Sequence, residues 1–214
     1  MIKVVFILLC SVPAFLWYRH TGDISLYLTE QMPPGQLPYI FSKLAGMYAL
    51  LMMMWQVIMT LIERLACRLN ISVSVRWLGV PHKVSGMIVF GLVIVHFLLF
   101  FSAVSMRQGY PAFGLLLPNL TDYFHLHVSA GLVAFWCLCV VAATGIYAGI
   151  KNRAVSRWHG LYSVSLGLAC LHGLSIGSEL AALMGTLFAG VLGTIVALLF
   201  VTKIGLVGKK EQTL

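Results

Sequence analysis

Four histidines in two apolar stretches are the residues of this sequence whose type and spacing suggest chemistry. His82 and His96 are 14 residues apart, one at the edge of the run Pro81 to Phe100 and one deep inside it, and His159 and His172 are 13 residues apart in a second apolar run. At about 1.5 Å of helical rise per residue, the members of each pair lie roughly 20 Å apart along a helix axis. The spacing therefore predicts two layers of histidines, one near each face of a membrane.

Such layers suit bis-histidine ligation of heme, in which neutral imidazole nitrogens approach the iron from both sides. An ionisable side chain deep in a bilayer is costly and is by default a functional hypothesis. One buried histidine alone is equally well explained by a hydrogen bond to a neighbouring hydroxyl or carbonyl. Four histidines in two matched layers favour binding, and a structural protein without a cofactor would have to hold them by accident.

The two runs differ in the angle between their histidines around the helix axis. Fourteen residues at about 100° each return to within roughly 40° of the starting face, so His82 and His96 can face one partner. Thirteen residues leave His159 and His172 roughly 140° apart on a straight helix. Two explanations stay open: a distortion of this helix, with Gly167 as the obvious place, or an oblique crossing that lets each histidine reach its own heme.

The composition is that of an integral membrane protein. Of 214 residues, 60% are hydrophobic and 9% are charged, with a mean hydropathy of +0.96, whereas a soluble domain carries about 25% charged residues. A spanning helix needs roughly 17 to 25 apolar residues. The apolar runs predict a single domain over 1–214, an all-α, polytopic bundle of six transmembrane helices at about 3–18, 40–62, 84–106, 124–150, 159–178 and 180–205.

The net charge of +8 follows the predicted loops and is not the footprint of a nucleic-acid surface. Only Arg19, Lys43 and Arg107 lie on one side of the predicted bundle. The positive-inside rule therefore predicts an N-in, C-in orientation. The basic residues expected on the cytoplasmic side are Lys3, Arg64, Arg68, Arg76, Lys83, Lys151, Arg153, Arg157, Lys203, Lys209 and Lys210.

Three other features allow two interpretations each. The first apolar run follows Lys3 like a signal peptide, but it lacks a small-x-small cleavage pattern and is taken as a helix. His125 and His127 diverge by about 200° on a helix, so at most one is expected to face the bundle; they mark an outer substrate, metal or quinone site, or are solvated at the interface. The methionines of 47–59 favour adaptable packing over axial ligation. The five cysteines predict no disulfide framework.

Four segments share the order and spacing of one family: His82-Lys83 with His96, Thr144-Gly145, Arg157-Trp158-His159, and His172-Gly173. They resemble the ferric reductase-like transmembrane domain shared by NADPH oxidases and ferric-chelate reductases, and the spacings of 14 and 13 are those of its diheme members. The resemblance covers the second to sixth predicted helices. It implies that His82 and His159 ligate an inner heme b and that His96 and His172 ligate an outer one.

The chain departs from NADPH oxidases in ending just after the sixth predicted helix and in holding no Gly-rich dinucleotide fingerprint. Electrons are therefore expected from a separate cytoplasmic flavoprotein or from a quinol. The chain is also similar in size and helix count to the heme membrane subunit of the bacterial periplasmic methionine-sulfoxide reductase system, which lacks a counterpart of His82. The expected location is the inner membrane of a bacterium.

The primary expectation is a diheme b-type cytochrome, an oxidoreductase component that moves electrons across the membrane to a ferric chelate, oxygen or a partner reductase outside. No catalytic residue beyond the heme ligands is expected, and the partners are lipid, the electron donor and a periplasmic acceptor protein. Two alternatives stay open: an electron-transfer subunit of a periplasmic enzyme, and a non-enzymatic heme sensor or carrier. The donor, the acceptor and the direction of flow are not encoded in any motif.

Overall fold

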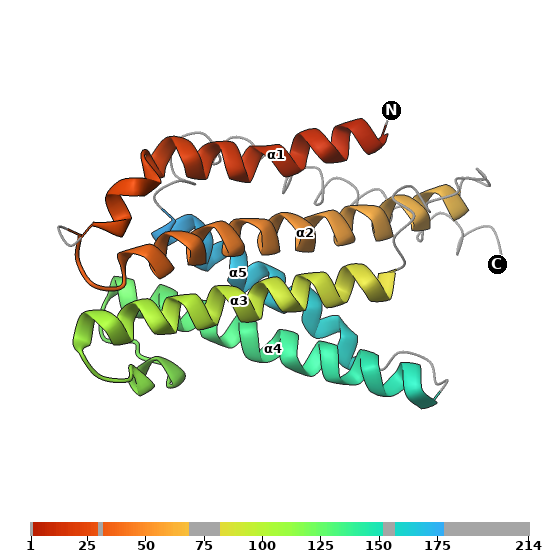
Figure 1. The fold of residues 1–214 in the computed structure, drawn as a ribbon. Coiled ribbons are helices and arrows are strands. Elements are labelled where there is room, and N and C mark those ends of the chain that lie inside the picture. The colour runs from red at the N-terminus through yellow and green to blue at the C-terminus, as the bar shows by residue number, and fades with distance from the viewer. Residues whose placement is uncertain (1, 30–31, 69–81, 152–156, 178–214) are drawn as a thin grey trace.

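The computed structural model describes residues 2–29, 32–68, 82–151 and 157–177, and these form helices joined by short connections (Figure 1). The α-helices are α1 (Ile2–Thr21), α2 (Gln36–Arg68), α3 (His82–Gln108), α4 (Tyr123–Lys151) and α5 (Leu161–Ile176). Short 3-10 helices are η1 (Ile24–Leu28), η2 (Phe113–Leu116) and η3 (Arg157–Gly160). The predicted all-α class is confirmed for these residues. The predicted helix 180–205 and most of the basic loop before α3 lie outside them.

Within the described residues, α2, α3 and α4 are long and apolar enough to cross a membrane. Large apolar side chains are exposed along their outer faces, with Met87 of α3 70% exposed and Ile150 of α4 73% exposed. Large apolar side chains on outward faces suit contact with lipid, where the internal hydrogen bonds of a helix leave no backbone group unsatisfied. These helices are therefore compatible with a membrane protein.

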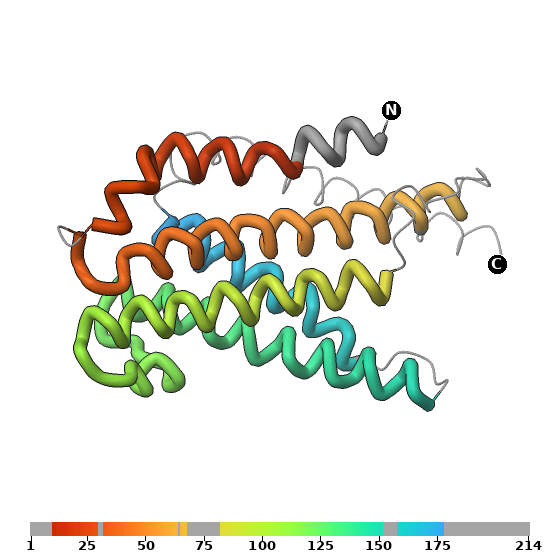
Figure 2. Tube along the Cα trace, viewed as in Figure 1, coloured from red at the N-terminus to blue at the C-terminus, as the bar shows by residue number. Residues whose placement is uncertain are grey.

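The helices form two antiparallel hairpins, α2 with α3 and α4 with α5 (Figures 1 and 2). α1 packs along α2, and the Trp17 indole N–H donates a 2.6 Å hydrogen bond to the carbonyl of Ile40. Buried side chains from four helices meet between the hairpins, including Met53, Val89, Leu138 and Leu166. Because apolar packing joins the hairpins, residues far apart in sequence are held at fixed distances.

The start of α2 shows how the hairpins are held at one end. α2 begins four residues before the predicted boundary at 40, and Pro38 lies in its first turn, where a missing N–H costs little. Gly35, just before α2, has a φ of +76° and lies against the backbone of Ala103 in α3. A side chain at this position would collide with that backbone, so glycine permits both the turn and the contact.

The fifth predicted helix starts differently from the expectation. His159 lies in η3, and α5 begins only at Leu161. Gly167 lies inside the continuous α-helix α5, so the helix is unbroken at the place that one of the two open explanations named. The irregularity is instead the 3-10 turn of η3, which winds with three residues per turn. α5 also crosses α2 and α3 obliquely (Figure 1), and this crossing was the other explanation left open by the sequence.

Candidate functional site

The structure brings together His96 of α3 and His172 of α5, here called the outer pair. The ring centroids are 6.1 Å apart, and the ring planes are inclined at 73°. The two residues are 76 positions apart in the sequence. They meet because the α2–α3 and α4–α5 hairpins pack face to face, so the members of the predicted outer layer lie opposite one another.

Both outer imidazoles are anchored at Nδ1 by a neighbouring helix. The Nδ1–H of His96 donates to the backbone carbonyl of Ser42 in α2 at 2.8 Å, and the Nδ1–H of His172 donates to the carbonyl of His127 in α4 at 2.8 Å. A carbonyl only accepts hydrogen bonds, so each neutral ring carries its proton on Nδ1. The lone pair of each ring is therefore on Nε2 and is available to a ligand.

Ser42 holds His96 at a second point. The Ser42 hydroxyl donates a 3.0 Å hydrogen bond to the backbone carbonyl of His96, and its oxygen lies 3.1 Å from Nδ1 of the same residue. Ser42 is 1% exposed. The histidine is thus fixed through both its ring and its backbone by one residue of α2.

A cavity surrounds the outer pair. It is partly open to the surroundings, and its lining is mainly apolar. Phe97 and Phe135, stacked with centroids 5.0 Å apart, form part of one wall. Binding sites for organic molecules are commonly apolar cavities with a few polar groups at defined places. Here the polar groups include the two imidazoles.

The inner pair is His82, the first residue of α3, and His159 of η3. Their ring centroids are 6.0 Å apart, and their planes are inclined at 69°. His82 is exposed and His159 is partly buried. The Nδ1 of His159 is buried and has no hydrogen-bond partner among the described residues. The inner pair thus has the ring separation of the outer pair without its carbonyl anchors.

Side chains support the inner pair from the middle of the bundle. The Tyr162 ring stacks on His159, with centroids 6.5 Å apart and planes inclined at 16°. The Tyr162 hydroxyl donates to Oε1 of Gln56 at 2.7 Å, and the Gln56 amide donates to the Ser85 hydroxyl at 2.9 Å. Ser85 in turn donates to the carbonyl of His82 at 3.0 Å. This chain of contacts, called here the inner polar network, links η3 and α5 to α2 and α3.

Cations lie near both ends of the described bundle. At the outer end, Lys43 lines the cavity, and its Nζ lies 4.9 Å from the centre of the Tyr39 ring, while the Arg107 guanidinium lies 4.7 Å from the same ring. At the inner end, Lys83 reaches towards α4, where a Cβ at Gly149 would lie 3.1 Å from its Nζ. Positive groups at these places suit a ligand with an apolar body and negatively charged edges.

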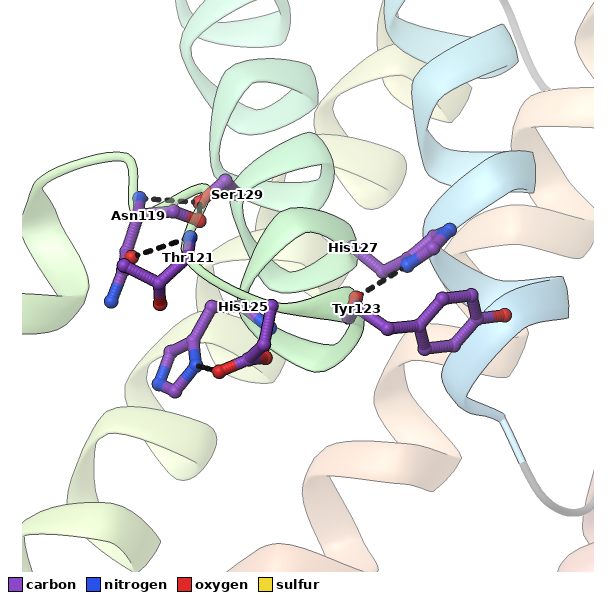
Figure 3. Close-up of polar contacts among 7 residues, drawn as sticks. Asn119, Thr121, Tyr123, His125, His127 and Ser129 are labelled. Carbon is purple, nitrogen blue, oxygen red and sulfur yellow. Dashed lines mark hydrogen bonds and ion pairs between the residues drawn. The ribbon is translucent and has the colours of Figure 1, made fainter.

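His125 and His127 point to opposite sides of the first turns of α4 (Figure 3). His127 is buried, and its Nδ1–H donates to the carbonyl of Tyr123, whereas the side chain of His125 is 45% exposed and contacts Asp122 at 2.6 Å. The prediction that at most one of them faces the bundle is confirmed. His125 borders a second cavity, which shares Leu115, Val128 and Leu132 with the outer cavity. An outer site at His125 stays a prediction.

Sequence reasoning missed the residues that hold the histidines. Ser42, Gln56 and Tyr162 contact the pairs or their supports, yet none belongs to a motif. A signal existed for Gln56, because a polar amide inside an apolar run is expensive unless it is satisfied. The methionines of α2 pack as expected, with Met47, Met53 and Met54 buried, and the cysteines within the described residues are free.

Comparisons of this chain with protein-family models, curated proteins and solved structures found no match. The geometry of the two pairs is therefore the feature from which a function can be inferred.

Proposed function

We propose that this chain is a diheme b-type cytochrome that moves electrons across a membrane. In this proposal His82 and His159 ligate an inner heme b, and His96 and His172 ligate an outer one. The chain is an N-in, C-in bundle of six spans in the inner membrane of a bacterium. It belongs with the ferric reductase-like transmembrane domains that its histidine pattern resembles.

The observation that carries the proposal is the separation of the rings. An imidazole nitrogen lies about 2 Å from a bound metal ion and its ring centre about 1 Å further, so two imidazoles on opposite sides of one ion have centres about 6 Å apart. The measured separations are 6.0 and 6.1 Å. Both pairs therefore have the ring separation that two histidines would need to hold one metal ion between them.

The number of donors also supports heme over a bare ion. A structural zinc ion takes four protein ligands, whereas each pair brings together two histidines. A heme would bring its own four nitrogens, so the two histidines of each pair would be enough to hold it. The mainly apolar cavity at the outer pair, with Lys43 in its lining, would suit the apolar body and the charged edge of such a group.

The two pairs divide the thickness of the membrane. His82 and His96 are both in α3, 14 residues apart, which is about 21 Å of helix in a hydrocarbon core about 30 Å thick. Heme would supply one-electron redox chemistry at each pair. The protein fixes the histidines, surrounds the outer pair with mainly apolar side chains and sets the separation between the layers. The donor is a cytoplasmic flavoprotein or a quinol, and the acceptor is a ferric chelate, oxygen or a partner reductase outside.

Purified full-length protein tests the proposal directly. We expect a reduced-minus-oxidised absorption spectrum of b type and two hemes per chain. Protein in vesicles should then pass electrons from an enclosed reductant to a ferric chelate outside, which a heme sensor or carrier would not do. Protein produced with ample heme that contains no heme would overturn the proposal. If the protein binds two hemes but passes no electrons across the vesicle membrane, the heme sensor or carrier would replace the proposed electron-transfer function.

A further inference from the structure

The anchor of His96 involves a glycine as well as a carbonyl. The Ser42 carbonyl accepts the Nδ1–H of His96, and Gly46 lies four residues further along α2. A Cβ built on Gly46 would lie 2.9 Å from Nδ1 and 3.0 Å from Cε1 of His96. The imidazole therefore rests directly on the backbone of α2 at this glycine.

The anchor of His172 repeats this arrangement on α4. The His127 carbonyl accepts the Nδ1–H of His172, and Gly131 again lies four residues further along the helix. A Cβ on Gly131 would lie 2.7 Å from Nδ1 and 2.9 Å from Cγ of His172. Two hairpins with different sequences thus hold their histidines in the same way.

The spacing of four residues has a physical reason. In an α-helix, the carbonyl of residue i accepts the N–H of residue i+4, and its second lone pair stays free. A ring that reaches this lone pair from the side lies over residue i+4. Any side chain there would occupy the space of the ring, because real Cβ atoms do not approach other heavy atoms within 3.0 Å. Glycine at i+4 therefore makes the second hydrogen bond possible.

Three other glycines of the bundle do not share this environment. A Cβ on Gly91 of α3, Gly145 of α4 or Gly167 of α5 would meet nothing within 4 Å. Close contact with an imidazole is therefore specific to Gly46 and Gly131 among these positions, and it is not a general result of tight helix packing.

We propose that Gly46 and Gly131 are positioning residues for the outer pair. Together with the Ser42 and His127 carbonyls they fix the two rings at their steep inclination of 73°, keep the proton on Nδ1 and present Nε2 as the ligand. A hydrogen bond from Nδ1–H to a carbonyl raises the basicity of the ligating nitrogen. The inference rests on the proposed function, since it assigns these glycines a role in heme ligation.

The test compares G46A and G131A with the matched controls G91A and G145A. Each variant is produced as full-length protein, and heme per chain, the reduction potentials and the ferric EPR spectrum are measured. Steeply inclined imidazole planes give ferric low-spin heme a signal with a large maximum g value, which falls as the planes become parallel. We expect the controls to match the wild type.

In G46A and G131A we expect the displaced ring to change the outer signal and raise the outer reduction potential. Outer heme affinity should fall about 10- to 100-fold, as with other outer-shell changes at metal sites, while the inner heme stays. Wild-type spectra and potentials in both variants would overturn the inference while leaving the proposed function intact. Loss of both hemes from both variants would also overturn it, because the glycines would then serve the whole bundle. A wild type without heme would defeat the proposed function itself.

Discussion

The outer and inner histidine pairs have almost the same ring separation, 6.1 and 6.0 Å, but they are held by different parts of the protein. The outer rings are anchored by main-chain carbonyls of α2 and α4. The inner rings have no such anchors among the described residues; the Tyr162 ring stacks on His159, and the Ser85 hydroxyl bonds the main-chain carbonyl of His82. The comparison shows that one ring separation can be reached by two routes.

The two routes respond differently to substitution. A backbone carbonyl keeps its position whatever side chain the residue carries, provided that the helix and the neighbouring glycine remain. A side-chain network changes with every substitution in it, and a buried group that loses its partner costs about 1 to 3 kcal/mol. The outer site should therefore be rigid, and the inner site should be adjustable.

The largest effects are expected when one histidine of a pair is replaced, because each substitution should affect one site and leave the other unchanged. H172A should lose the outer heme and keep the inner one, because the outer ring is gone and the inner pair lies about 20 Å away. H159A should do the reverse. Heme per chain and the EPR spectrum of each purified variant measure this, with H125A as the control, since His125 lies outside both pairs. Two hemes retained in either ligand variant would contradict the assignment.

A smaller effect is expected in the inner polar network. Y162F removes the hydroxyl that bonds Gln56 and leaves Oε1 of that residue without this donor. We expect a loss of about 1 to 3 kcal/mol in unfolding free energy and a shift in the reduction potential of the inner heme alone. Y147F, which alters an exposed tyrosine of α4, is the control. A change in reduction potential confined to the outer heme would contradict the assignment of Tyr162 to the inner pair.

S42A should have a still smaller effect on the outer pair. The substitution removes the hydroxyl bond to the His96 carbonyl but keeps the main-chain carbonyl that accepts from Nδ1. We expect a loss of about 1 kcal/mol in unfolding free energy, with an unchanged outer EPR signal. S163A, at an exposed position of α5, provides the reference. An outer signal altered as strongly as in G46A would show that the side chain, and not the main chain, sets the ring.

The smallest effect concerns the cap of α4, the helix that supplies the His127 carbonyl. The His125 backbone N–H, followed by its side chain, holds the pKa of Asp122 below its ordinary value. A lowered folded pKa stabilises the fold above the unfolded value of about 3.9, and this contribution is lost as the pH falls through the folded pKa. Tm measured at pH 6 and about pH 3 should therefore fall slightly more in the wild type than in D122N. Equal decreases in Tm in the wild type and D122N would show that the Asp122 cap does not stabilise the fold in this pH range.

Much of this fold follows from hydrophobic length alone. The positions of α2, α3 and α4 agree with the apolar runs to within a few residues at most ends, because a spanning segment must satisfy its own backbone hydrogen bonds. The start of α5 differed, since apolar character does not distinguish a 3-10 turn from the first turn of an α-helix. Orientation and the sixth helix stay predictions.

The candidate site was only partly predictable. Histidines are rare in apolar runs, so their spacing indicated the members of each pair. The anchors were hidden because Ser42 and His127 act through carbonyl groups that every residue possesses. Gly46 and Gly131 had no distinguishing sequence signal, since glycine is common in this chain. Only the approach of each ring to a helix separates them from Gly91 and Gly145.

The glycine at i+4 also suggests a simple rule for building such sites. An engineer who wishes to orient a histidine between two helices does not need a polar side chain to hold it. A glycine on the neighbouring helix exposes the carbonyl one turn earlier, and that carbonyl fixes the ring while the rest of the helix surface stays apolar. In a membrane, each added polar side chain hinders insertion. A glycine orients the histidine without adding a polar group, because it only removes a side chain from the helix surface.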